Sequence, residues 1–131
     1  MPLDFLSLDE IIEIHRDQVE RYGGELGIRD VALLQSAVAV PKAAFGGEFL
    51  HSDIFEMAAA YLFHIVKNHP FIDGNKRTGA VAAVVFLAVN GVELQAGGNA
   101  FERLVVSVVS GKAGKKAIAA FLREHSKPAT S

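Results

Sequence analysis

The chain has 131 residues, 50% hydrophobic and 21% charged, with a formal net charge of −2 at pH 7. This length and composition predict one globular domain, 1–131, and exclude a disordered or fibrous protein. The charge argues against direct nucleic-acid binding through phosphate neutralisation, and the absence of cysteine excludes a disulfide framework. Neither a basic leader nor an apolar run of about 20 residues occurs, so we expect a cytoplasmic protein without membrane contact.

The first predicted helix follows Ser7. Glu10 stands three residues after this serine, which is the capping-box pattern, and Gly23 and Gly24 end the helix. A stripe of apolar residues should face the core: Leu8, Ile11, Ile12, Ile14, Val19 and Tyr22. A second helix is expected to start at Asp30 and to end before Pro41.

The segment 43–52, AAFGGEFLHS, carries paired glycines between aromatic residues. This composition predicts a turn or short hairpin on the surface, which we treat as a candidate flap.

Two helices are expected to run through the middle of the domain. Ser52 or Asp53 should cap the first of them, which is apolar on nearly every face and ends at Asn68 and His69, before Pro70. The second should run from Asn75 to Asn90 and Gly91.

Two further helices complete the predicted fold. Asn99 and Glu102 repeat the capping pattern ahead of one of them, and the segment 115–125 is amphipathic. Strand-like sequence is limited to GVELQ, at 91–95, and the segment 43–52. The fold class is therefore predicted as all-α, a compact six-helix bundle with a short β-hairpin.

Polar chemistry is concentrated in NHPFIDGNKRTG, residues 68–79, which joins the two central helices. If a helix starts at Asn75, the free amides of Gly74, Asn75, Lys76 and Arg77 lie at its positive end and favour a phosphate. Lys76 and Arg77 add full charges, and Gly74 allows the backbone to curl around an anion.

Three other residues of this loop have predicted roles. Asp73 could hold a Mg²⁺ ion that bridges phosphate oxygens, which implies a nucleotide. His69 could take a proton from a hydroxyl as a general base. Phe71 most simply pins the loop by pointing its ring into the core.

Taken singly, these features have structural explanations: a histidine before proline can cap a helix, and GNKRT can be a solvated first turn. Their combination favours a functional site, because a structural loop does not need all of these residue types. A GxxxxGK[ST] phosphate loop is excluded because His69 stands where its first glycine would be. No HExxH zinc pattern occurs, and His64 is expected to be packed or partly exposed.

The segment HPFIDGNKRTG closely resembles the signature of the Fic/Doc (Fido) family, and specifically its Doc branch of toxins. The residues that match are His69, Phe71, Asp73, Gly74, Asn75 and Arg77. Lys76 and Ala80 depart from the adenylyl-transferring branch, which has a glycine and a second arginine at these positions. RYGGELGIRD, at 21–30, is similar to the stretch that follows the first helix in Doc-like proteins.

The resemblance implies the Fido fold, with a flap that aligns the target segment beside the signature loop; residues 43–52 are our candidate for it. It also implies a kinase that transfers the γ-phosphate of ATP, with Mg²⁺, to a Ser or Thr hydroxyl. The implied target is elongation factor Tu, whose modification arrests translation. Lys76 would occupy the space that an α-phosphate needs, so the nucleotide would bind in the reverse direction.

The family's inhibitory-helix pattern, [ST]xxxE[GN], does not occur in this sequence. The resemblance therefore implies a toxin–antitoxin pair, with a separate, Phd-like antitoxin bound in a groove of the toxin. Two alternatives are a Fic-type adenylyltransferase, which would move AMP with the same base, metal and amides, and an interaction domain without catalysis.

Overall fold

The computed structural model describes residues 2–129 and contains six α-helices. The helices are α1 (Leu8–Tyr22), α2 (Val31–Ala39), α3 (Ile54–Asn68), α4 (Asn75–Val89), α5 (Ala100–Val109) and α6 (Lys115–Glu124), and a short 3-10 helix, η1 (Val40–Lys42), follows α2. The strands are β1 (Ala44–Phe45), β2 (Glu48–Phe49), β3 (Val92–Leu94) and β4 (Ser126–Pro128). The prediction of an all-α fold with a short hairpin is confirmed. No helix within the described residues combines the length and apolarity needed to span a bilayer.

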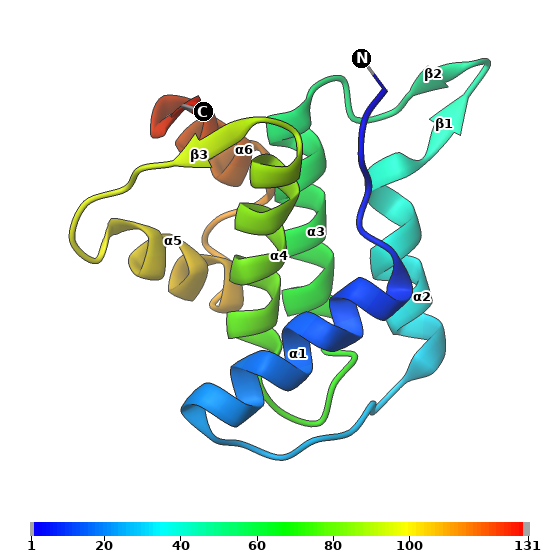
Figure 1. Cartoon of the computed structure of the whole chain (residues 1–131), viewed down its shortest axis with the longest axis vertical. Helices are drawn as coiled ribbons and strands as arrows, with labels where there is room; N and C mark the ends of the chain where they lie inside the picture. The colour runs from blue at the N-terminus through cyan, green and yellow to red at the C-terminus, as the bar shows by residue number, and fades with distance from the viewer. Residues whose placement is uncertain (1, 130–131) are drawn as a thin grey trace.

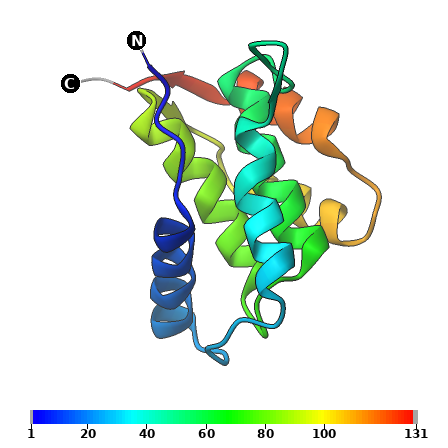
Figure 2. The same cartoon turned by 90° about the vertical axis from the view of Figure 1, so that its right-hand side faces the viewer.

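The antiparallel pair α3 and α4 forms the centre of the molecule (Figure 1). Gly79 lets the two helices approach closely, because a Cβ atom there would lie 3.1 Å from the carbonyl oxygen of Leu62 and 3.1 Å from a methyl group of Val66. α1 packs across α4, whereas α2 and α6 pack against α3 (Figures 1 and 2). Both central helices therefore bury most of their length and fix the loop that joins them.

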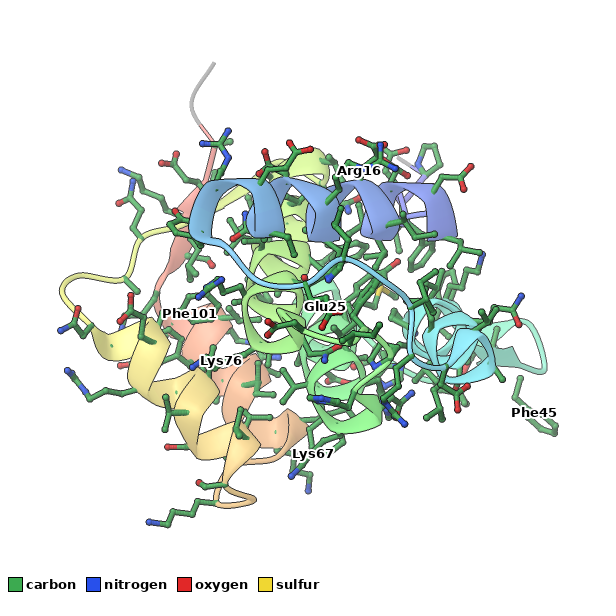
Figure 3. All side chains as sticks on the ribbon, turned by 90° about the horizontal axis from the view of Figure 1, so that it is seen from below. Arg16, Glu25, Phe45, Lys67, Lys76 and Phe101 are labelled. Atoms are coloured by element: carbon green, nitrogen blue, oxygen red, sulfur yellow. The ribbon has the colours of Figure 1, made fainter. Side chains whose placement is uncertain are left out.

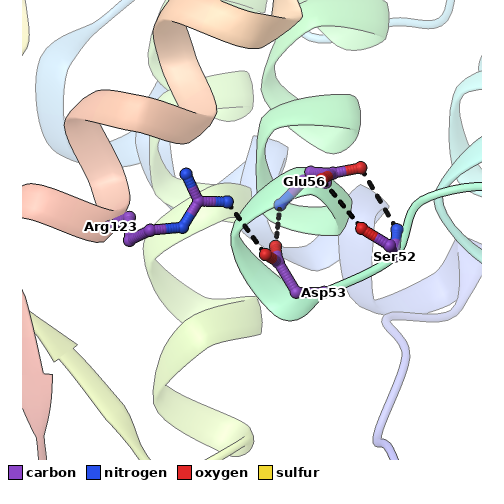
Figure 4. Close-up of polar contacts among 4 residues, drawn as sticks. All are labelled: Ser52, Asp53, Glu56 and Arg123. Carbon is purple, nitrogen blue, oxygen red and sulfur yellow. Dashed lines mark hydrogen bonds and ion pairs between the residues drawn. The ribbon is translucent and has the colours of Figure 1, made fainter.

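Side-chain caps define where three helices begin. Ser7 and Glu10 form the predicted capping box, with bonds of 3.1 and 3.0 Å, and Asp30 accepts from the Leu33 amide at 3.0 Å. Asp53 accepts from the Glu56 amide at 2.8 Å and also pairs with Arg123 at 2.8 Å (Figure 4). That ion pair links α6 to the start of α3.

Three local predictions were wrong. Tyr22 is 63% exposed, and His15 and Gln18 instead fill buried positions on α1. Asn99 makes no capping hydrogen bond, because its backbone (φ −103°, ψ 18°) lacks the extended geometry that directs a cap side chain at the helix amides. The strand β4 was not foreseen, and it pairs antiparallel with β3.

The hairpin of β1 and β2 lies at the wrong end of α3 for the predicted flap (Figure 1). It precedes the N-terminus of α3, whereas the loop 69–74 follows its C-terminus, about 22 Å away along a helix of this length. The segment 23–30, between α1 and α2, lies beside the loop instead. The prediction that residues 43–52 flank the signature loop was therefore wrong.

Candidate active site

His69 ends α3 in a left-handed conformation (φ 51°, ψ 53°), and it is the only non-glycine residue with positive φ in the part of the chain that the structure describes. Such backbone geometry costs on the order of 1–3 kcal/mol and persists only where the surrounding structure holds it. Arg29 supplies that hold: its Nε donates to the His69 carbonyl at 2.6 Å and its Nη2 to the Asn68 carbonyl at 2.9 Å. The imidazole of His69 is exposed.

Phe71 anchors the middle of the loop in the core. Its ring is fully buried and stacks on the ring of His15, with centroids 3.8 Å apart and an interplanar angle of 5°. The side-chain amide of Asn75 bonds both main-chain groups of Phe71, accepting from its N–H and donating to its carbonyl at 2.9 Å each. The Asn75 side chain thus shapes the loop, and only its main-chain amide is left for a ligand.

The segment 24–30 supports the outer side of the loop through main-chain bonds. The Ile72 amide donates to the Gly27 carbonyl at 3.0 Å, and the Pro70 carbonyl accepts from Arg29 at 2.7 Å and from Asp30 at 3.0 Å. Ile28 forms an antiparallel bridge with Phe71. The chain between α1 and α2 therefore acts as a short strand beside the loop.

Two main-chain amides hold the exposed carboxylate of Asp73. Oδ1 accepts from the Gly74 amide at 2.8 Å and Oδ2 from the Glu25 amide at 3.3 Å. Gly24 has φ 117°, where any side chain would be strained, and a Cβ there would also lie 2.9 Å from Oδ2, so this position favours glycine. The Gly74 amide, which the sequence suggested would be free, is already engaged by the neighbouring carboxylate.

The N-terminus of α4 has no side-chain cap. Gly74 precedes it with φ 77°, in the left-handed region that favours glycine, and gives the helix no side-chain cap. The first helical bond within α4 runs from the Thr78 amide to the Gly74 carbonyl at 3.0 Å. The amides of Asn75, Lys76 and Arg77 consequently have no acceptor among the described residues, as expected for the first turn of an uncapped helix.

Two exposed cations flank this turn. Lys76 makes no ion pair within residues 2–129. The Arg77 guanidinium lies over the Tyr22 ring, 5.2 Å from its centroid, with Nη1 3.5 Å from the Gly23 carbonyl. Arg77 is therefore directed toward the end of α1.

These groups line one pocket of about 570 Å³; its lining residues are Val66, Lys67, His69, Asp73, Gly74, Asn75, Lys76, Arg77 and Val109. Figure 3 shows Lys67 and Lys76 on the face of the molecule where α3 ends and α4 begins, with Phe45 at the far edge. A second groove of about 480 Å³ shares Lys76 and Arg77 and continues between α1, α4 and α5, along Tyr22 and Phe101. The described structure thus brings every predicted site residue except the buried Phe71 to one pocket.

The residues present fit a magnesium nucleotide. Each Asp73 oxygen accepts one hydrogen bond and keeps a lone pair for a hard cation. The described residues hold no cluster of three His, Cys, Asp or Glu side chains that could enclose a metal ion. Mg²⁺ is commonly held by one or two carboxylates together with substrate phosphates, and the free amides and cations beside Asp73 suit such phosphates.

Sequence reasoning missed two residues that hold the loop, His15 and Arg29. His15 is spaced four residues from both Ile11 and Val19 and thus falls on the buried stripe of α1, a pattern that could have identified it. Arg29 lies in an irregular segment, so neither periodicity nor a motif indicated its role.

His64 lies away from this pocket. Its Nε2 is 3.0 Å from the Lys115 ammonium, which also lies 3.4 Å from Nε2 of His51. Burial, followed by the nearby Lys115 charge, lowers the pKa of His64 to about 4. His64 is thus a half-buried neutral acceptor, consistent with the predicted packing role.

Residues 5–87 match the Fic/DOC family. The chain is also 47% identical over 75 residues to a protein named Toxin Doc from Mycolicibacterium smegmatis, a match that covers 57% of this chain and 58% of the relative. It is 35% identical over 89 residues to a protein named Protein kinase doc from Escherichia phage P1, covering 68% of this chain and 70% of the relative. The first match therefore spans less than two thirds of that relative's length.

Proposed function

Because the chain belongs to the Fic/DOC family, we propose that it is a Doc-type toxin that transfers the γ-phosphate of ATP to a Ser or Thr hydroxyl of a protein. One observation carries this proposal: an exposed histidine, a carboxylate and an uncapped helix start with two cations line the same pocket. The names of the two relatives, a toxin and a protein kinase, support it.

His69 is the general base. Its exposed imidazole borders the pocket at the end of α3, and Arg29 restrains the main chain that carries it. A neutral imidazole there takes the proton of the attacking hydroxyl, and the restrained main chain keeps the ring at the edge of the pocket.

Asp73 holds the Mg²⁺ ion that accompanies the nucleotide. When bound there, the ion would supply positive charge that offsets the negative charge developing on the phosphate during transfer. The amides of Glu25 and Gly74 fix the carboxylate, so it meets the ion in a preset orientation.

The amides of Asn75, Lys76 and Arg77 bind phosphate oxygens at the start of α4, with Gly74 as the turn that exposes them. The exposed side chain of Lys76 borders both the pocket and the groove, and it adds positive charge where the family's other branch has glycine. It narrows the approach to the amides, which favours entry of a terminal phosphate over an α-phosphate, which has the ribose on one side and the β-phosphate on the other.

The partners follow from this assignment. The protein target is inferred to be elongation factor Tu, which the resemblance implies, and its modification arrests translation. A Phd-like antitoxin is inferred to neutralise the toxin. The groove along Tyr22, Ala80 and Phe101 is a suitable place for an antitoxin segment, because it is largely apolar and shares Lys76 and Arg77 with the pocket.

The test is incubation of the protein with ATP and Mg²⁺ in a bacterial extract, followed by intact-mass analysis of the proteins that change. Phosphate transfer adds about 80 Da and AMP transfer about 329 Da, as fixed by the group transferred. A gain of about 80 Da on one protein that disappears with Asp73→Ala supports the proposal. A gain of about 329 Da identifies an adenylyltransferase, and no gain on any protein identifies a binding domain; either result contradicts the kinase assignment.

A further inference from the structure

His15 contacts the signature loop from α1, although 58 residues separate it from Asp73 in the sequence. Its Nε2 lies 2.8 Å from the Asp73 carbonyl oxygen, and its ring stacks on Phe71. A carbonyl oxygen can only accept, so Nε2 must carry a hydrogen. The side chain is almost fully buried. It does not line the pocket, so it acts on the loop from behind.

The contact fixes the direction of one peptide plane. The Asp73 carbonyl and the Gly74 N–H belong to the same planar trans peptide unit, so they point in opposite directions. With the carbonyl bound to His15, the N–H faces the Asp73 carboxylate, and it does so at 2.8 Å. The orientation of this peptide therefore decides which group, a donor or an acceptor, borders the pocket.

Gly74 makes the opposite orientation accessible. Glycine adopts positive and negative φ almost equally well, so a flip of the 73–74 peptide meets no side-chain barrier at this residue. A flipped peptide would turn the Asp73 carbonyl oxygen toward the carboxylate and the phosphate pocket, where it would repel both. The Gly74 N–H bond to the Asp73 carboxylate favours the observed orientation from within the loop, and the His15 contact is the bond that favours it from outside.

We propose that His15 is a positioning residue that locks the Asp73–Gly74 peptide with its N–H toward the Asp73 carboxylate, and so keeps that carboxylate and the start of α4 ready for a magnesium nucleotide. This inference rests on the proposed nucleotide-binding function of the pocket. The locked peptide itself, however, is a property of the ligand-free protein.

The first test needs no activity. Long-range ¹H–¹⁵N correlation spectra of the ligand-free protein report which ring nitrogen of His15 is protonated. The proposal requires a hydrogen on Nε2. A neutral ring with its hydrogen only on Nδ1 would overturn it, because Nε2 could not then bind the carbonyl. This result stands whether or not the protein proves to be a kinase.

The second test compares His15→Gln, whose side-chain amide can donate from nearly the Nε2 position, with His15→Phe, which keeps an aromatic ring on Phe71 but has no donor. MgATP affinity is measured by calorimetry and the Gly74 amide by ¹H–¹⁵N spectra. His15→Phe should bind MgATP about tenfold more weakly, the value of about one hydrogen bond, and His15→Gln should recover most of that loss. The Gly74 amide peak should shift in His15→Phe, because this variant keeps an aromatic ring beside Gly74 but loses the donor to the Asp73 carbonyl.

His125 offers a matched control. It also stacks on a phenylalanine, Phe121, at 4.0 Å, and its Nδ1 also lies 2.8 Å from a main-chain carbonyl, but it caps α6 rather than the loop. His125→Phe should leave MgATP affinity and the Gly74 peak unchanged.

Equal MgATP affinity and an unchanged Gly74 peak in both His15 variants would refute the lock. If His15→Phe does not fold, His15→Asn takes its place, because its shorter amide cannot reach the carbonyl. Loss of MgATP binding in the parent protein would instead count against the proposed function, while the tautomer and the Gly74 peak would still decide whether the peptide is locked.

Discussion

The two ends of the α3 and α4 pair are built differently. At the end that carries the loop 69–74, side chains and main chain from α1 and from the segment 24–30 bond the loop backbone at several points. At the other end, the hairpin of β1 and β2 is held by its own short ladder and by the contact of Phe49 with Phe5, whose ring centroids lie 5.5 Å apart, and Phe45 is 84% exposed at its tip. Within residues 2–129, the strands β1 and β2 receive no hydrogen bond from a distant segment, whereas the loop 69–74 receives several. The hairpin carries none of the candidate site residues, and its main chain is not held by such bonds.

The largest expected effect is on catalysis. His69 and His51 lie near opposite ends of α3. His69→Ala should lower the transfer rate by a factor of about 10² to 10⁴, because it removes the general base. His51→Gln should change the rate by less than about threefold, as is usual for substitutions away from a site. Rates are measured by phosphate incorporation into the target, with circular dichroism to show that both variants fold. Comparable losses of rate in the two variants would contradict the assignment of catalysis to the loop end of α3.

Two phenylalanines provide the corresponding comparison of stability. Phe71→Ala should lower the free energy of unfolding by about 3–5 kcal/mol, because it empties a fully buried ring position beside His15. Phe45→Ala should change it by no more than about 0.5 kcal/mol. Denaturant titration monitored by circular dichroism measures both. A Phe71 variant as stable as the Phe45 variant would show that the loop is not anchored through its ring.

Loss of the Asn75 side chain should have an intermediate effect on the free energy of unfolding. Asn75→Ala should cost about 2–3 kcal/mol, because it leaves both main-chain groups of Phe71 buried without a partner. The helix amide of residue 75 is retained, so the loss acts through loop geometry. Denaturant titration measures this cost, and amide exchange should rise first at residue 71. An unchanged exchange rate at residue 71 would contradict the role of the Asn75 side chain in holding the main chain of Phe71.

The smallest effect concerns pH and lies outside the loop. The pKa of His64 is lowered from 6.5 to about 4 in the folded protein by burial and by Lys115. Between these two pH values the unfolded chain therefore binds more protons than the folded chain. The contribution of His64 to the free energy of unfolding is complete above about pH 6.5 and is lost as the pH falls toward 4. Thermal unfolding between pH 7 and 4 should show a weaker pH dependence in His64→Gln. A parallel dependence in both proteins would contradict the assignment.

Much of the fold could be predicted from the sequence because local chemistry determined it. The capping box at Ser7, the cap at Asp53 and the start of α4 at Asn75 each depend on a few neighbouring residues, and all three occur as expected. The all-α class followed from the spacing of apolar residues. In such segments local preference and tertiary packing agree.

Other failures, unlike the missing cap at Asn99, depend on contacts between distant segments. Neither the end of α3 at which the hairpin lies nor the strand β4 beside β3 follows from local composition. The candidate site shows the same limit. Its residues could be grouped from a continuous motif, but the engagement of the Gly74 amide by Asp73 and the contact of His15 with the loop depend on the folded backbone.

The most direct test of the central claim is a titration of ¹⁵N-labelled protein with ATP and Mg²⁺. We predict saturable shifts of the Asn75, Lys76 and Arg77 amides, with the His69 ring perturbed at the same ligand concentration and Phe45 unaffected. Saturable binding that moves residues elsewhere and leaves the start of α4 unchanged would contradict the account.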